Sequence, residues 1–144
     1  YEKSKDLQVK KNSASEIASY YATVLENPES ARIWWEKVDQ GGASQEEIAA
    51  VYELAKMDGA VGKTDNAIQR LESLVARTVP KNTQWFVLVH YQLAALYHTL
   101  EQFPNALQHY QEVAEHPEVK GLEQYRDLSN KTALQIEAYL AQLQ

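Results

Sequence analysis

Four histidines and a few carboxylates are the residues of this chain that could do chemistry. The histidines are His90, His98, His109 and His116. His90 and His98 are eight residues apart, which puts them on similar faces of a helix but about two turns from each other, too far to share a metal ion. His109 and Glu112 share a face and could start a metal site, but no third ligand converges on them. The sequence therefore predicts neither a metal nor a cofactor.

The other polar motifs are also explained by helix ends and turns. The segment Gly59–Lys63 lacks the spacing of a phosphate-binding loop and would join two helices with no preceding strand. Ser44 and Glu47 have the spacing of a capping box, in which the two residues satisfy free N–H groups at the start of a helix. No nucleophile and base stand in a recognisable arrangement. We therefore predict that the protein is not an enzyme.

Composition narrows the class of protein. The chain has 144 residues, of which 44% are apolar, and this favours one globular domain over residues 1–144. The net charge of −6 argues against nucleic-acid binding. The chain has no cysteine, which excludes disulfides and thiolate chemistry. No apolar run in the sequence is long enough for a membrane span.

Residues 1–12 form a polar stem with four lysines. A solvated helix or a frayed end is the first interpretation. The alternative is a juxtamembrane stem that follows an upstream membrane anchor. The chain starts at Tyr1 rather than at a methionine, so we expect a trimmed or processed segment.

The elements that carry these residues follow a repeating pattern between about residues 87 and 120. Leu93, Ala94 and Tyr97 are followed by Ala106, twelve residues after Ala94, and by Tyr110. Small residues at the two alanine positions let two antiparallel helices approach closely, and the large residues fill the space around that contact. This spacing predicts a helix pair with Ala94 and Ala106 at its crossing.

A second copy covers about residues 48–81. Ala67 follows Ala55 by twelve residues, and Leu71 stands where Tyr110 stands in the other copy. This copy departs from the pattern at Asp58, where an aromatic residue is usual. A weaker third copy is expected at Ile17 and Ala18 with Tyr21, followed by Ala31 and Trp35, with a spacing that is one residue too long.

The segment 118–144 is expected to be a long C-terminal capping helix, since the last repeat of a stack needs an outer cover. Its expected buried stripe has a period near 3.6 residues: Leu122, Tyr125, Leu128, Thr132, Ile136, Leu140 and Leu143.

The two segments 52–75 and 91–113 resemble tetratricopeptide repeats, which cover about half of the chain. The resemblance implies an all-α fold of antiparallel helix pairs in a short right-handed α-solenoid. The layout, with Ala14, Ala18 and Tyr21 in a stem helix, is also similar to bacterial membrane-anchored repeat proteins of the YfgM-like, ancillary-translocon-subunit type. That likeness would favour the periplasm or the cell envelope over the cytoplasm. The lysines of the stem stand against it, because positive charge collects on the cytoplasmic side of a membrane span.

In such repeats, certain positions of the first helices face a concave groove. Here they are Tyr52, Lys56, Tyr91, Ala95 and His98. Tyrosine suits a peptide-binding surface, and the basic residues would favour an acidic or C-terminal carboxylate ligand. We expect the two tyrosines to be neighbours along the groove wall. The alternative is that the C-terminal helix covers this face and the tyrosines belong to the core.

Trp34 and Trp35 are adjacent, so on a helix they point about 100° apart and both can hardly face the same core. One is expected to pack with Ala31 and Val38. The other would be half exposed, either wrapped around a thin core or free to contact a partner.

These observations predict an interaction scaffold that binds a protein or peptide partner of unknown identity. The alternative is a structural protein whose repeats pack edge to edge into homo-oligomers.

Overall fold

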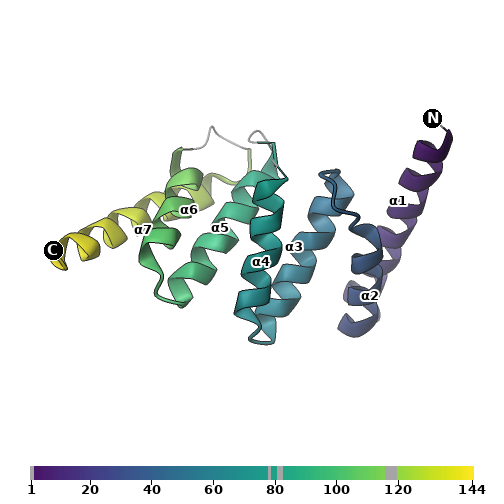
Figure 1. The fold of residues 1–144 in the computed structure, drawn as a ribbon, viewed down its shortest axis with the longest axis horizontal. Coiled ribbons are helices and arrows are strands. Elements are labelled where there is room, and N and C mark those ends of the chain that lie inside the picture. The colour runs from purple at the N-terminus through teal and green to yellow at the C-terminus, as the bar shows by residue number, and fades with distance from the viewer. Residues whose placement is uncertain (1, 78, 81–82, 116–119) are drawn as a thin grey trace. The chain divides into compact units, whose positions relative to one another are not determined.

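The structure is a computed structural model that describes the backbone of residues 2–77, 79–80, 83–115 and 120–144, and their side chains from residue 13 onward. All secondary structure in these residues is helical, as predicted (Figure 1). The helices are α1 (Glu2–Thr23), α2 (Pro28–Val38), α3 (Gln45–Ala60), α4 (Thr64–Ala76), α5 (Gln84–Thr99), α6 (Phe103–Glu115) and α7 (Glu123–Gln142). Within this described part, no helix is both long and apolar enough to cross a membrane.

The chain divides into two compact units, Tyr1–Thr78 and Val79–Gln144. The first contains α1 to α4 and the second contains α5 to α7. Because the chain forms two compact units, the expectation of one domain over residues 1–144 stays a prediction. The right-handed stacking of all the helix pairs also stays a prediction.

In the first unit, α1 packs against α2, α2 against α3, and α3 against α4. Small residues make the first contact close, because Ala18 and Ala31 are both fully buried in one cluster with Trp35 and Leu54. The backbone of residues 2–12 continues α1, so the polar stem is helical. Asn27 caps α2 with its side-chain oxygen, which accepts from the N–H of Ser30 at 3.1 Å.

The predicted cap of α3 is present. The Ser44 hydroxyl accepts from the N–H of Glu47 at 3.2 Å. The Glu47 carboxylate also reaches beyond the helix: it accepts from the N–H groups of Gln40 and Gly42 and from the Ser44 hydroxyl. One buried carboxylate thus ties the loop before α3 to the start of that helix.

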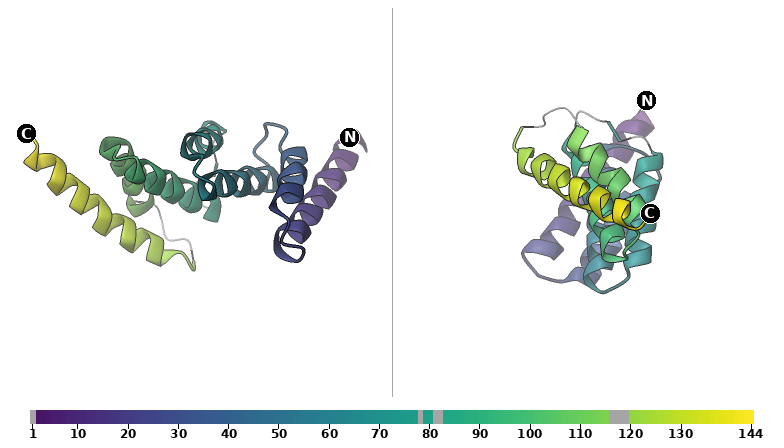
Figure 2. Two further views of the ribbon diagram at one scale, coloured as in Figure 1. Left: turned by 90° about the horizontal axis from the view of Figure 1, so that it is seen from below. Right: turned by 90° about the vertical axis from the view of Figure 1, so that its left-hand side faces the viewer.

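In the second unit, α5 packs against α6, and α7 lies against α6 with a smaller contact to α5 (Figures 1 and 2). Ala94 and Ala106 are fully buried in one cluster with Tyr110, Ala133 and Ile136, which confirms the predicted close contact of α5 and α6. The repeat spacing therefore located this crossing correctly.

The expected stripe of α7 needs correction. The buried residues of α7 are Ser129, Ala133 and Ile136, whereas Leu128 and Leu143 of the expected stripe are exposed. The helix has a neighbour along one narrow face, so only residues three or four apart on that face are covered. Of the capping segment predicted at 118–144, residues 118 and 119 lie outside the described residues, as does His116.

Candidate functional site

The two adjacent tryptophans differ as expected. Trp35 is buried with Ala31 and Val38, and Trp34 is half-buried at the edge of the same cluster. The Lys37 ammonium stands 4.1 Å from the ring centroid of Trp34. This cation–π contact covers part of the ring that a partner could otherwise use.

Tyr52 and Lys56 lie one turn apart on α3. Tyr52 is half-buried and Lys56 is exposed, with its ammonium 5.5 Å from the centre of the Tyr52 ring. The same ammonium lies 3.6 Å from Glu53 Oε1. The positive charge predicted to attract an acidic ligand is therefore partly balanced by a neighbour on its own helix.

A buried ion cluster that the sequence analysis did not predict lies beside these residues. Asp58 is only 2% exposed and its carboxylate joins three helices. Arg32 of α2 contacts its Oδ1 at 2.8 Å, and Arg70 of α4 donates to its Oδ2 at 2.7 Å. Asp58 thus replaces the usual aromatic residue of the repeat with a charged contact between α2, α3 and α4.

The electrostatics of this cluster favour the charged carboxylate. Burial alone would raise the pKa of Asp58, but the hydrogen bonds and charges of Arg70 and Arg32 outweigh burial and hold that pKa below its ordinary value. The cluster is structural, because each of its charges has a partner.

The candidate residues of the second unit lie along α5, and the C-terminal helix covers one of them. The ring of Tyr91 meets Tyr125 of α7 edge to face at 5.0 Å and Tyr110 of α6 at 6.1 Å. Ala95 is half-buried. Within this unit, Tyr91 is half-buried and belongs to the aromatic packing between α5, α6 and α7.

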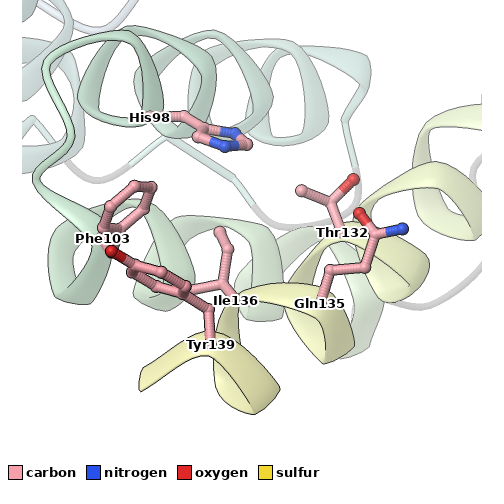
Figure 3. A pocket seen from close by; sticks show the side chains of 6 residues that line it. All are labelled: His98, Phe103, Thr132, Gln135, Ile136 and Tyr139. Atoms are coloured by element: carbon pink, nitrogen blue, oxygen red, sulfur yellow. The ribbon is translucent and has the colours of Figure 1, made fainter. Parts of the chain in front are cut away.

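His98 has a different setting, at the wall of an open pocket (Figure 3). The pocket lies between α5, the start of α6 and α7, and its volume is about 220 Å³. Figure 3 shows Phe103 and Tyr139 beside each other on one side, with Thr132 and Gln135 on the other. The lining residues are His98, Phe103, Thr132, Gln135, Ile136 and Tyr139.

Aromatic contacts hold the walls of this pocket in place. Phe103 meets Tyr139 edge to face at 5.2 Å and His98 at 5.8 Å. Behind the wall, His98 Nδ1 is 3.2 Å from the Tyr110 hydroxyl. Burial, with a smaller contribution from the nearby Tyr91, raises the pKa of Tyr110 to about 12. This hydroxyl therefore stays protonated at neutral pH.

A second histidine contact, between His90 and His109, was not predicted from the sequence. Both rings are buried, and their Nδ1 atoms are 2.9 Å apart. The signal was available: His90 comes four residues before Ala94 and His109 three after Ala106, so antiparallel pairing at the two alanines brings the histidines opposite each other. The short distance requires a single proton between the two nitrogens.

No metal site forms from these groups in the part of the chain that the structure describes, since no three His, Asp or Glu side chains converge there. Tyr52 and Tyr91 belong to different compact units, so their neighbourhood along a groove remains a prediction. Comparison with known proteins adds no further information, because no family model, curated protein or solved structure matches the chain.

Proposed function

We propose that the protein is a non-catalytic, tetratricopeptide-like interaction module that binds a protein or peptide partner. The observation that supports this most directly is the aromatic pocket of the second unit. It includes His98, which the repeat pattern predicted as a partner-binding residue, and it combines rings from α6 and α7. Concave sites lined by aromatic side chains with a few polar groups are typical binding sites.

The surface next to the pocket supports the same function. Leu128 and Leu143 lie on the same flank of α7 as Tyr139, and all three side chains are exposed. An outer covering helix would be expected to turn polar residues to solvent. An apolar flank beside a pocket gives a partner both an anchor point and additional surface to cover.

Selection from a library of displayed peptides tests this function. Peptides selected on the wild-type protein should bind it in solution and shift the amide resonances of residues around the pocket. Binding should weaken in Tyr139→Ala, which removes one wall. Tyr52→Ala and Trp34→Ala test the candidate residues of the first unit in the same assay. A selection that yields no peptide with reproducible binding would contradict the proposal.

Self-assembly is the second candidate, and the exposed side chains of α7 favour it specifically. Leu128, Leu134, Tyr139 and Leu143 are 48%, 58%, 46% and 66% exposed. A second copy could bury them. Light scattering after gel filtration separates the two functions: a monomer at every concentration favours the interaction module. A mass that rises with concentration, and that Leu128→Ser with Leu143→Ser abolishes, favours assembly.

A further inference from the structure

The buried histidine pair between α5 and α6 is separate from the residues that line the pocket beside His98. The rings of His90 and His109 are 8% and 7% exposed, and their Nδ1 atoms are 2.9 Å apart. Each ring lies about one turn from an alanine of the close helix contact, His90 before Ala94 and His109 after Ala106. The protonation state of the pair therefore bears directly on how closely the two helices can meet.

The short distance limits how many protons the pair can hold. At 2.9 Å one Nδ1 must donate and the other must accept, so the space between them takes one proton. A first added proton can go to Nε2 of the donating ring, and the contact then persists as a charge-assisted hydrogen bond. A second added proton would place an N–H group on both Nδ1 atoms, so that two donors and two positive charges face each other. The clash arises at the Nδ1 atoms, whatever the Nε2 atoms contact.

Neighbouring rings hold both imidazoles in this orientation. The centroids of the Phe86 and His90 rings are 4.4 Å apart. The Tyr97 ring stacks on His109 at 5.7 Å, with an angle of 5° between the two planes. In a closely packed interior, neither imidazole can turn its Nδ1 atom away without moving such a neighbour. Separation of α5 from α6 is therefore the way in which a doubly protonated pair is relieved.

The titratable groups of α5 and α6 near the pair are mainly phenols. On α5, Tyr97 covers the His109 ring, and on α6 the next residue is Tyr110. These two helices contain neither lysine nor arginine. The carboxylates of α6, Glu112 and Glu115, are exposed. Phenols titrate near pH 10 and carboxylates near pH 4, so histidine is the side chain that responds first to mild acid.

The groups of α7 meet other faces of these helices. The Tyr125 ring lies 5.0 Å from the ring of Tyr91 on α5. Glu137 Oε1 accepts from Gln111 of α6 at 2.8 Å. Because Gln111 is two residues after His109, it lies on the opposite side of α6 from the histidine contact. The carboxylate of Glu137 therefore faces away from the pair.

From this geometry we propose that His90 and His109 form a pH switch. At neutral pH their shared proton holds α5 against α6, and the crossing opens when both rings are protonated. The pocket beside His98 combines residues of α5, α6 and α7, so opening disrupts it and releases a bound partner. The switch itself does not depend on the proposed interaction function, whereas the release of a partner rests on it.

The direction of the pH effect follows from the number of protons bound. In the open chain the two histidines titrate near pH 6.5 and together take up two added protons in acid, while the closed pair takes up at most one. The open state therefore binds more protons as the pH falls. The contribution of the pair to stability is complete above about pH 6.5 and is lost below it. A difference of one bound proton changes the equilibrium by about tenfold per pH unit.

Amide hydrogen exchange of the full chain, corrected for the intrinsic effect of pH, tests the switch. Between about pH 6.5 and about pH 5, the protection of amides in α5 and α6 should fall by about tenfold or more. Residues 1–78 contain no histidine, so the protection of α3 and α4 is an internal control and should change much less. Nitrogen NMR of the histidine rings adds a readout without any mutation: at neutral pH, only one ring of the pair should carry a proton on Nδ1.

Variants assign the effect to the pair. The double variant His90→Phe with His109→Phe removes both titrating rings, so the fall in protection should disappear. His98→Gln removes another histidine of the same unit and should keep the fall of the wild type. Circular dichroism at neutral pH checks that each variant is folded. A peptide selected on the wild-type protein should bind it about threefold or more weakly at the lower pH, because the closed form is then less populated. Its affinity for the double variant should stay constant.

Equal protection of α5 and α6 at the two pH values, an equal fall in both units, or a fall that persists in the double variant would overturn the switch. A proton on Nδ1 of both rings at neutral pH would do the same. If the double variant does not fold, the comparison of the two units and the NMR measurement on the wild type decide. If no peptide is selected, the proposed function fails and hydrogen exchange still tests the switch. Constant peptide affinity, with opening seen by exchange, would overturn the release of a partner.

Discussion

At the scale of single residues, buried charged and polar side chains fix how the helices of each unit pack. Asp58 is the clearest case. Its position is one where the repeat pattern expects an aromatic side chain, and a carboxylate there is stable because Arg32 and Arg70 donate to it from two other helices. Without those arginines, burial would make the charge costly.

Replacement of Asp58 by asparagine should therefore lower the free energy of unfolding. We expect a loss of about 1–3 kcal/mol at pH 7, at or below the cost of breaking a buried pair, because both arginines are about 30% exposed. Urea denaturation followed by circular dichroism measures it. Asp65→Asn, at an exposed position of α4, is the control and should change little.

The same carboxylate predicts the response to acid. Its pKa is lowered on folding, so its contribution to stability is complete above the unfolded value of about 3.9 and is lost as the pH falls through the lower folded value. As the pH falls below about 4, the wild type should lose more stability than Asp58→Asn. Parallel acid curves for the two proteins would contradict this prediction.

His90 and His109 should be energetically coupled. Their shared hydrogen bond is buried. Replacing one histidine by phenylalanine removes this hydrogen bond from the other ring, whereas replacing both leaves no ring nitrogen that requires it. A double-mutant cycle in urea should give a coupling energy of about 1 kcal/mol. A cycle between His90 and exposed Asn105 serves as the control and should give none.

At the scale of helices, the alanine pair and the capping carboxylate determine how elements meet. Ala106→Leu should overpack the crossing of α5 and α6 and cost about 1–3 kcal/mol of stability. Ala138→Leu makes the same change at an exposed position of α7 and should be nearly neutral. Equal melting temperatures for both variants would mean that this crossing tolerates larger residues.

Gly42→Ala should loosen the entry to α3. A Cβ at Gly42 would stand 2.6 Å from Glu47 Oε1, so the carboxylate must move and weaken its bonds to the loop. The expected loss is about 1–2 kcal/mol, measured by denaturation. Ala43→Ser is a suitable control, because Ala43 is exposed in the same loop and its replacement should change stability little.

Helices and their close contacts were predictable because they depend on local periodicity and short spacings. The cap at Ser44 follows from two residues three apart, and the Ala94–Ala106 contact follows from two alanines twelve apart within one repeat. The Asp58 cluster was not predictable, since it needs the positions of α2 and α4 around α3. The exposure of Leu128 and Leu143 on α7 was not predicted, because an apolar stripe in the sequence does not show how much of it a neighbouring helix covers.

At the scale of the whole molecule, each compact unit has a core of its own: Ala18, Ala31 and Trp35 in the first, and Ala94, Ala106 and Ile136 in the second. Ala106→Leu should therefore accelerate amide hydrogen exchange in α5 and α6 much more than in α1 and α2. Asp58→Asn should do the reverse. Equal acceleration across all helices would show that the units open together.

The absence of lysine from α5 and α6 also affects which covalent chemistry can reach them. Between Lys81 and Lys120 the sequence offers no primary amine. Acetylation, ubiquitin attachment and amine-directed cross-linking therefore cannot mark these two helices, and trypsin has no cleavage site within them. A partner docked on this part of the surface would escape lysine-based mapping, whereas carboxylate-directed reagents would detect it through Glu101, Glu112 and Glu115.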